Sequence, residues 1–370
     1  MAEVYDTTEC PRVGLAEALA GARPLCRVLL AGGGEAVPNR PMLWPADIED
    51  VNALHDPAAS PALTADAFVH FIRDVQVGGY GCAVVKDGRY VYNDSAYPYY
   101  ARFYIEQGLS EPFWSVAALD PLHIDYPIHV ITHFNPIYGH WLLEILPKLF
   151  AIGVLMKRGL MAPILLPRAA AALLADTIAL ILPGCPIVEY DHERQTVHAV
   201  TVILPPMLQH NYVFNPLLRA LLSDFLAPFR ANPGPAAIFV SRSALQGRFR
   251  AIADPDALDH ASGAMGLTIV RPETLPWTEQ VRIFASARLI VGEYGSGLHN
   301  TFFSPAGARV VSLNVMGNVQ SSIANSFKQD VGYLLDPDGQ PRRYTIDWTV
   351  AQTYTIDLDD YRRRVAPLLA

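Results

Sequence analysis

Residues 287–313 read ARLIVGEYGSGLHNTFFSPAGARVVSL and place a glycine-rich turn between two apolar runs. The first run, Ala287–Val291, has the length and β-branched content of a buried strand. Gly292, Gly295 and Gly297 then crowd a turn ahead of residues 298–303. Backbone N–H groups at such a turn attract anions, and a helix after Gly297 would add its unpaired N–H groups and positive dipole end. The stretch predicts a strand–turn–helix unit that binds a phosphate, although turns of this kind also serve as tight connections without a ligand.

The segments around this turn repeat a β-α order. Strand-like runs lie at 237–242, 267–272, 288–292 and 308–314, and helical patterns lie at 254–265 and 277–287. Elements that alternate in this way favour a parallel sheet with helices on both faces, and ligands of such sheets bind beyond the carboxyl ends of the strands. The expected fold class is therefore α/β.

The length of 370 residues favours two domains, because single cores stop growing at about 250–300 residues. The stretch RANPGP at 230–235 concentrates residues that break helices and strands, and it is the expected linker. This boundary gives an N-terminal α/β domain over residues 1–229 and a C-terminal domain over residues 236–370.

The N-terminal domain is expected to combine a β-rich start with α/β alternation. Residues 78–104 alternate like hairpins, with Asp87-Gly88 between two strand-like runs. Further strands are expected at 126–134, 163–167, 187–190 and 197–204, and helices at 138–155, 171–182 and 215–229.

The composition excludes several classes of protein. Hydrophobic residues make up 51% and charged residues 17% of the chain, which excludes a largely disordered protein. The net charge of -8 provides no basic field for nucleic acid, so no nucleic-acid partner is expected despite a local basic patch at 242–250. Four scattered cysteines without CxxC pairs indicate reduced thiols.

The N-terminus lacks the pattern of a secretory signal. Glu3, Asp6 and Glu9 stand where a signal needs a basic start and an apolar core, and no apolar stretch is expected to reach about 18 residues. These features predict a cytoplasmic protein. A mean hydropathy of +0.19 leaves room for peripheral contact with the inner face of the membrane, or for a buried homodimer interface.

The segment NPIYGHWLLEILPKL at 135–149 carries the clearest candidate for acid–base chemistry. His140 and Glu144 lie one turn apart on one face of the expected helix. A carboxylate that accepts a hydrogen bond from imidazole fixes its tautomer and raises its basicity, which makes histidine a general base near neutral pH. The alternative is a partly buried histidine at a helix start beside Trp141, without a catalytic role.

Three polar clusters follow the expected strand ends of the C-terminal domain. They are Ser241-Arg242 with Arg248 and Arg250, the pair Pro272-Glu273, and the turn at 292–297. Strand ends of one polarity share one sheet edge, so the arginines are expected to converge on the anion that the turn binds. The planar fork of arginine suits this role because it donates two hydrogen bonds to a phosphate. The alternative is that Arg248 and Arg250 are solvated loop charges.

Neither a metal site nor a hydrolase site is expected. His123, His129, His133 and His140 suggest a metal because His129 and His133 share one side of a strand, but no nearby acid or cysteine completes a ligand set. The stretch YGSGL is similar to a serine nucleophile elbow, but Tyr294 stands where the GxSxG motif needs glycine.

Three ordered motifs carry a family resemblance. NPIYGHWLLEILPKL, then FVSR with RFR, then LPWTEQVRIFASARLIVGEYGSGLHNTFFSPAGARVVSL together resemble glycosyltransferase family 61, whose bacterial members are often described as capsular polysaccharide biosynthesis proteins. The resemblance covers the chain from Asn135 to Leu313. It implies a GT-B-like fold, with two Rossmann-like domains facing a cleft, here preceded by a β-rich N-terminal extension.

The resemblance implies an inverting transfer of a sugar from a nucleotide-sugar donor to a glycan hydroxyl, in capsule or exopolysaccharide biosynthesis. The donor, for which a UDP-sugar is favoured, is a substrate, and the family needs neither a cofactor nor an obligatory metal. His140, oriented by Glu144, becomes the candidate base. The candidate donor-binding residues are Ser241, Arg242, Arg248, Arg250, Gly292, Gly295, Ser296, Gly297 and Asn300.

Two departures from the family pattern keep an alternative function open. Many relatives have a His-Gly pair where this chain has Tyr294-Gly295, and an Asn-Glu pair where it has Ala253-Asp254. The alternative is a catalytically silent glycan-binding or scaffold protein with the same fold. A different nucleotide-dependent enzyme that uses the same sheet edge is a third hypothesis.

Overall fold

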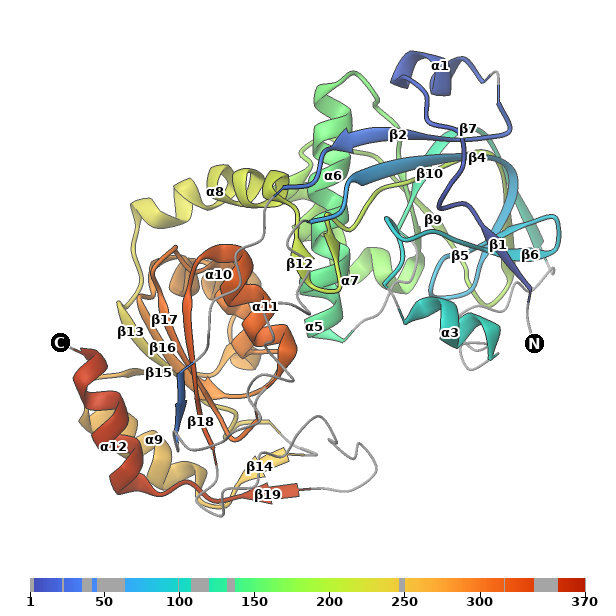
Figure 1. Cartoon of the computed structure of the whole chain (residues 1–370). Helices are drawn as coiled ribbons and strands as arrows, with labels where there is room; N and C mark the ends of the chain where they lie inside the picture. Colours follow the sequence, from blue (N-terminus) through green and yellow to red (C-terminus); the bar gives the residue numbers. More distant parts are fainter. Residues whose placement is uncertain are drawn as a thin grey trace. The chain divides into compact units, whose positions relative to one another are not determined.

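The computed structural model describes residues 3–21, 23–34, 42–44, 64–98, 100–107, 120–131, 137–245, 250–315, 317–335 and 352–369. These residues form two compact units, whose helices and strands are labelled in Figure 1. Unit 1 contains the chain up to Gly34 and the segment Thr64–Leu221, and unit 2 contains residues 42–44 and the chain from Leu222 onward. Both units mix helices with a sheet, so the expected α/β class is confirmed.

Unit 2 is built on a parallel sheet. In the described part of the chain, its strands follow the order β15 (Thr268–Val270), β13 (Ala237–Val240), β16 (Leu289–Glu293), β17 (Arg309–Leu313), β18 (Asp330–Leu334) and β3 (Met42–Trp44). Every neighbouring pair runs parallel. The helical segments between these strands are α9 (Pro255–Ala264), η3 (Pro272–Thr274), α10 (Trp277–Ser286), η4 (Leu298–Phe303) and α11 (Asn318–Phe327). The β-α alternation expected for the C-terminal half is confirmed.

The strand order of unit 2 reverses direction between β13 and β16. From β13 the chain passes through α9 to β15 on one side, and then through α10 to β16 on the other side of β13. Ligands of open α/β sheets bind outside the carboxyl ends of the strands at such a reversal. The residues that follow β13 and β16 are therefore at the sheet edge that the fold favours for a ligand.

The C-terminal helix α12 (Leu358–Val365) completes the core of unit 2. Tyr361 is fully buried, with its ring centroid 6.4 Å from that of Phe239 on β13. Its hydroxyl lies 2.6 Å from Oγ of Ser262 on α9, and Figure 1 shows α12 beside α9. The 3₁₀ turn η5 (Ala366–Leu369) follows, and a separate parallel pair joins β14 (Arg250–Ile252) to β19 (Gln352–Tyr354).

Unit 1 is built on a mixed sheet. Among the described residues its strand order is β1 (Val4–Asp6), β6 (Arg89–Tyr92), β5 (Ala83–Lys86), β4 (Ala67–Gly78), β10 (Gln195–Leu204), β7 (Asp120–Val130), β8 (Ile164–Pro167) and β9 (Ile187–Tyr190), with β2 (Leu25–Ala31) paired to β4. The strands from β10 to β9 run parallel, whereas β4 pairs antiparallel with its neighbours. The expected turn at Asp87-Gly88 joins β5 to β6, with φ of 50° and 75° at the two residues. Positive φ at both positions is typical of tight hairpin turns.

A long helix of unit 1 begins at Tyr138 and ends at Lys157. It consists of α5 (Tyr138–His140), the π-helical turn η2 (Trp141–Ile145) and α6 (Leu146–Lys157), drawn in green in Figure 1. The helix has 20 residues, and an 18-residue window within it has a mean hydropathy of 1.4, so it is long and apolar enough to span a membrane. This corrects the expectation that no apolar stretch reaches about 18 residues. Because 78% of the apolar window is buried inside the protein, the helix has the character of a core helix.

Unit 1 contains further helices and one small hairpin. They are α1 (Leu15–Ala20), α3 (Ala101–Glu106), α7 (Arg168–Ile181), and the hairpin of β11 (Gln209–His210) and β12 (Val213–Phe214).

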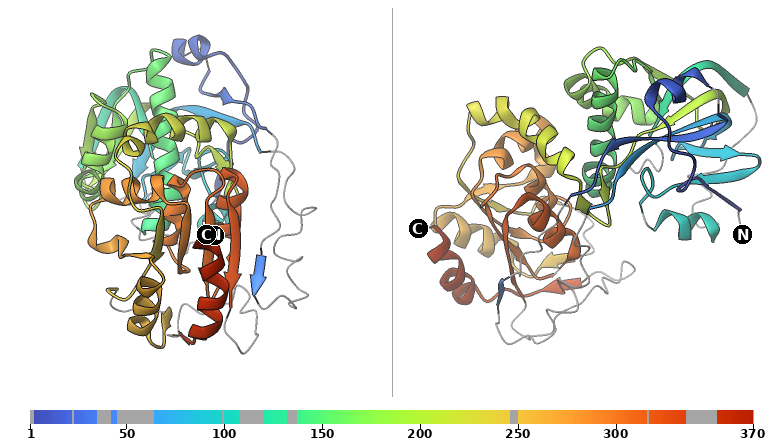
Figure 2. Two further views of the ribbon diagram at one scale, coloured as in Figure 1. Left: turned by 90° about the vertical axis from the view of Figure 1, so that its left-hand side faces the viewer. Right: turned by 45° about the horizontal axis from the view of Figure 1, so that its top comes forward.

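Helix α8 (Pro216–Ala231) contains the position at which the two units divide. The division falls after Leu221, whereas the sequence placed the linker at 230–235, and Arg230 and Ala231 are the last residues of α8. β3 belongs to unit 2 although it precedes most of unit 1 in the chain, and Figures 1 and 2 show it as a blue arrow beside β18. The pairing of β3 with β18 joins segments from opposite ends of the chain, which no local sequence pattern encodes.

Candidate functional site

The long helix of unit 1 brings His140 and Glu144 into contact, as the sequence predicted. Nδ1 of His140 lies 2.9 Å from Oε1 of Glu144. The Glu144 side chain is 1% exposed, whereas that of His140 is 31% exposed. The π-helical turn at Trp141–Ile145 carries Glu144, and such turns are frequent at functional sites. The carboxylate of the pair is therefore buried inside the protein, while the imidazole ring is partly exposed to solvent.

Two tyrosines complete the contacts of this carboxylate. The Tyr100 hydroxyl lies 2.8 Å from Nδ1 of His140 and donates to Glu144 at 2.8 and 3.0 Å from its two carboxylate oxygens. The Tyr212 hydroxyl donates to Oε1 of Glu144 at 3.4 Å. Sequence reasoning missed both tyrosines, because they come from distant segments and have no spacing relation to the helix.

These contacts assign the tautomer of His140. An ionised carboxylate only accepts hydrogen bonds, so its contact with Nδ1 requires a proton on that nitrogen. Nε2 then carries the lone pair, and it bonds no side chain in the described part of the structure. A histidine held in this way is suited to accept a proton from a bound molecule.

The environment of His140 raises its pKa above 6.5. Burial opposes the charged imidazolium, but the hydrogen bond to Glu144 and the negative charge of Glu144 outweigh that effect. The group therefore takes up its proton at a higher pH than an isolated histidine.

Lys148 lies one helical turn beyond Glu144 and is fully buried. Burial lowers its pKa to about 7, while the negative charge of Glu144 opposes that shift. From the sequence alone, a lysine at this position is expected on the helix surface, because lysine is almost never fully buried unless it is paired. Its complete burial is a finding of the structure.

In unit 2 the predicted clusters at the ends of β13 and β16 do meet. The backbone N–H of Arg242 donates to Oε1 of Glu293 at 3.0 Å, and Nη1 of Arg242 donates to the carbonyl of Tyr294 at 2.8 Å. A Cβ on Gly295 would lie 2.7 Å from Nη1 of Arg242, so the guanidinium packs directly over the glycine turn. Gly292 allows the close approach of β13, because a Cβ there would lie 2.6 Å from Cβ of Val240. Sequence reasoning missed Glu293, whose carboxylate joins the two strand ends.

Ser241 begins a second polar network at the same edge. Its Oγ donates to Oγ of Ser243 at 3.0 Å, and Ser243 donates to Oδ2 of Asp259 at 3.0 Å. Arg271 follows β15 and bonds both Ser243 and Asp259, at 2.8 and 2.6 Å. The Arg271 side chain remains 39% exposed, so this edge presents a second arginine that the sequence did not single out.

The turn itself differs from the expected helix start. The segment after Gly297 is the short 3₁₀ helix η4, in which the N–H of Leu298 donates to Gly295 and that of Asn300 to Gly297. These two N–H groups are therefore not free for an anion, because a 3₁₀ turn closes its bonds one residue earlier than an α-helix. The N–H groups of Gly295, Ser296 and Gly297 make no hydrogen bond within the described residues.

Three other predicted donor-binding residues have different outcomes. Asn300 is buried and bonds Oε1 of Gln280 at 3.0 Å, which gives its side chain a role inside the protein. Arg250 forms the first pair of β14 with Gln352 of β19, and only its backbone is described. Arg248 lies outside the described residues.

The histidines considered for a metal have different surroundings where the structure describes them. His129 is buried and neither ring nitrogen bonds a described residue; burial lowers its pKa to about 3. His133 lies outside the described residues. Across the part of the chain that the structure describes, no group of three His, Cys, Asp or Glu side chains is arranged to hold a metal ion.

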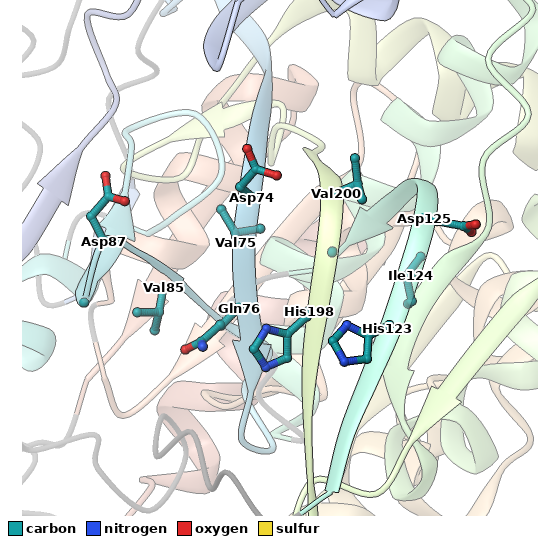
Figure 3. Close-up of a pocket in the computed structure, with 12 residues that line it drawn as sticks. Asp74, Val75, Gln76, Val85, Asp87, His123, Ile124, Asp125, His198 and Val200 are labelled. Atoms are coloured by element: carbon teal, nitrogen blue, oxygen red, sulfur yellow. The ribbon is translucent and has the colours of Figure 1, made fainter.

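His123 instead lines a hollow of about 560 Å³ on one face of the unit 1 sheet, shown in Figure 3. Its ring stacks on His198 of the neighbouring strand, with ring centroids 5.1 Å apart. Gln76 continues this row on β4, and Asp74 and Asp125 lie on the same face. The hollow contains none of the residues predicted to bind a donor.

A comparison with protein-family models matches residues 138–311 to Glycosyltransferase 61. The matched segment begins at the first residue of α5 and ends within β17, so it contains both the His140–Glu144 helix and the edge formed by β13 and β16. No curated protein matches the chain.

Proposed function

The chain belongs to glycosyltransferase family 61 through residues 138–311, and from that premise we propose that it transfers a sugar from a nucleotide-sugar donor to a hydroxyl of a glycan acceptor. The observation that carries the proposal is the family match over a segment that holds an oriented histidine and an arginine-bearing sheet edge. A role in capsule or exopolysaccharide assembly, in the cytoplasm at the inner face of the membrane, is part of the same proposal.

The donor nucleotide is proposed to bind at the carboxyl ends of β13 and β16. The strand order reverses there, and the Arg242 guanidinium packs over the turn at Gly295–Gly297. Arginine donors and free backbone N–H groups suit a diphosphate, and they would stabilise the negative charge that develops on it as the sugar leaves. A UDP-sugar remains the favoured donor. Arg271 is a further candidate for this edge.

His140 is proposed as the general base. Nε2 would accept the proton of the acceptor hydroxyl while that oxygen forms a bond to the anomeric carbon and the nucleoside diphosphate leaves with the bonding electron pair. Such a single displacement inverts the anomeric configuration. It needs one base and one site for the leaving group, and neither role requires a metal ion. The GT-B arrangement implied by the family resemblance is proposed with it, with unit 2 binding the donor and unit 1 supplying the base.

Calorimetric titration with UDP, GDP, CMP and ADP, with and without EDTA, tests the donor site. We expect one nucleotide class to bind, with an affinity that EDTA does not change and that falls at least tenfold in Arg242→Ala. Arg288→Ala is the matched control, because Arg288 is exposed and directly precedes the first residue of β16, at the other end of the strand from the proposed donor site. Absence of binding to every nucleotide would refute the donor site and favour a catalytically silent glycan-binding protein.

His140→Ala tests the base separately. The variant is expected to bind the nucleotide as the wild type does, and to lose donor turnover by about 10²-fold or more. Unchanged turnover with intact nucleotide binding would remove His140 from its role.

A further inference from the structure

A row of aromatic rings leads from the surface of unit 1 to the imidazole ring of His140. The ring centroid of Phe103 lies 5.8 Å from that of Tyr104, and the Tyr104 centroid lies 5.9 Å from that of Tyr100. The Tyr100 centroid in turn lies 5.9 Å from that of His140. Each pair is T-shaped, which is a favourable arrangement for aromatic rings. The row is therefore a continuous contact surface that ends at the proposed base.

The helix α3 presents these rings on one of its sides. Tyr100 directly precedes α3, and Phe103 and Tyr104 follow it at the spacings of three and four residues that make neighbours on a helix surface. Ala101 and Ile105 lie on another side and are buried in the core of unit 1. Figure 1 shows α3 and α5 at the same end of this unit. Burial of one side of α3 thus fixes the direction in which the aromatic side points.

The charged residues of α3 lie on a third side of the helix. Nη1 of Arg102 donates to Oδ2 of Asp6 on β1 at 2.8 Å, and Nε of Arg102 donates to Oε1 of Glu106 at 3.0 Å. Arg102 and Glu106 are four residues apart, so they share a side that differs from that of the aromatic row. The aromatic side therefore suits a ligand that is bound by apolar contact and by neutral hydrogen bonds.

Two rings of the row are open to solvent. Phe103 is 57% exposed and Tyr104 is 42% exposed. Isolated exposed apolar residues are common, but adjoining ones beside a functional group are typical of ligand-binding surfaces. Tyrosine also adds a hydroxyl group at the tip of an apolar ring. Such a surface matches a sugar, which has an apolar C–H face and a rim of hydroxyl groups, whereas a phosphate would require cationic donors.

We propose that Phe103 and Tyr104 form a saccharide-binding subsite, on which a sugar ring of the acceptor glycan packs its C–H face. The electron-rich face of each aromatic ring attracts the weakly positive C–H groups of the sugar. The role of this sugar as the acceptor rests on the proposed function, because the row ends at His140 and the reacting hydroxyl has to reach Nε2 of that ring. The subsite orients the acceptor, and His140 accepts its proton.

Binding to an array of oligosaccharides, with and without saturating UDP, tests this subsite. The array carries neutral hexoses, N-acetylhexosamines and hexuronic acids, and calorimetry gives the affinity for each oligosaccharide that binds. We expect the wild type to bind at least one of them, and Tyr104→Ala to weaken that binding by about tenfold or more. Tyr104→Phe keeps the ring and should stay within about threefold of the wild-type affinity.

Tyr126→Ala is the matched control, because Tyr126 is 43% exposed and lies on β7, and it should leave the affinity unchanged. Phe103→Ala is a second variant, which should weaken binding of the same oligosaccharide. Both Phe103 and Tyr104 are exposed, so their alanine variants should keep the wild-type unfolding midpoint. Failure to bind any oligosaccharide, or equal affinities of Tyr104→Ala and the wild type, overturns the proposal.

Other outcomes distinguish the subsite from a membrane contact and from the proposed function. Binding to vesicles of phosphatidylcholine and phosphatidylglycerol that is lost in Tyr104→Ala, without saccharide binding, would overturn the subsite. Saccharide binding through Tyr104 in a protein that binds no nucleotide would refute the transferase and leave the subsite standing. Donor turnover with an unchanged acceptor KM in Tyr104→Ala would refute the subsite and leave the transferase standing.

Discussion

At the scale of single residues, Gly295 and Gly297 stand in one turn for different reasons. A Cβ at Gly295 would lie 2.7 Å from Nη1 of Arg242, whereas a Cβ at Gly297 would lie 3.4 Å from its nearest neighbour, an atom of Pro272. Gly297 also has φ of -63°, which alanine adopts without strain. Only Gly295 is therefore needed for the position of the guanidinium.

We expect Gly295→Ala to displace the Arg242 side chain, to cost about 1 kcal/mol of unfolding free energy through the lost hydrogen bond to the carbonyl of Tyr294, and to weaken nucleotide binding. Gly297→Ala should change stability by no more than about 0.5 kcal/mol and leave binding intact. Chemical denaturation and calorimetry on the two variants measure both effects. Equal loss of affinity in the two alanines would show that the turn, and not the arginine, sets the affinity.

In the proposed mechanism, in which His140 is the base, Glu144 determines how the activity depends on pH. Because the pKa of His140 is raised, the base becomes protonated and inactive as pH falls through a value above 6.5. Glu144→Gln removes the charge that raises it, so the acid limb of donor turnover should move to lower pH while the rate falls by about 10²-fold. A pH–rate profile with the same acid midpoint in both proteins would exclude Glu144 from this role.

At the scale of elements, the unit 1 sheet carries two histidines that should make it sensitive to acid. His70 on β4 and His129 on β7 are buried, and neither ring bonds a described side chain. Burial lowers the pKa of both to about 3, and for His70 the positive charge of Arg27 adds to this. A folded-state pKa below the unfolded value means that the unfolded chain takes up protons first. The stability of unit 1 is therefore expected to decline as pH falls from about 6.5 towards 3.

His129→Leu tests this decline. Removing an unbonded buried polar ring should raise the free energy of unfolding by about 1–3 kcal/mol at neutral pH, and by more at pH 5. His260→Leu, at an exposed position of α9, is the control and should not alter the slope of stability against pH. A His129→Leu protein whose stability has the wild-type slope against pH would contradict the lowered pKa of His129.

His140 affects stability in the opposite sense. Its raised pKa contributes stability below pH 6.5, and this contribution is lost as pH rises through the pKa of His140 in the folded protein.

The sequence predicted those elements that have a strong local pattern. The apolar runs at β13, β16 and β17, the Asp87-Gly88 hairpin and the helix from Tyr138 were all expected close to their observed positions. The π-helical turn at Trp141–Ile145 and the 3₁₀ form of η4 were not expected, because both depend on contacts outside the helix itself. The membership of β3 in unit 2 was equally hidden, since it arises from pairing with β18, almost 300 residues further along the chain.

Some residues of the candidate site could likewise be predicted from the sequence, and others could not. His140 and Glu144 could be found from their spacing, and the meeting of Arg242 with the glycine turn follows from the rule that parallel strand ends share an edge. Tyr100, Tyr212 and Lys148 could not be found, because burial and long-range contacts leave no periodic signal.

At the scale of the whole molecule, the chain separates into two units that carry different parts of the proposed chemistry. Unit 1 holds the histidine oriented by Glu144 and the hollow lined by His123 and His198, and unit 2 holds the arginine-bearing edge. A nucleotide that binds at only one of these places should therefore protect the backbone amides of one unit from exchange and leave exchange in the other unit unchanged. This gives a direct way to locate the donor without knowing the acceptor.

Hydrogen–deuterium exchange with and without UDP is the measurement that tests the central claim most directly. With the nucleotide at about 100 times its Kd, which would add about 2.7 kcal/mol of stability, we expect the strongest protection in peptides that contain Ser241–Ser243 and Glu293–Leu298. Peptides from the hollow lined by Gln76, His123 and His198 should be unchanged. Protection confined to that hollow, or no protection anywhere in the chain, would contradict the account.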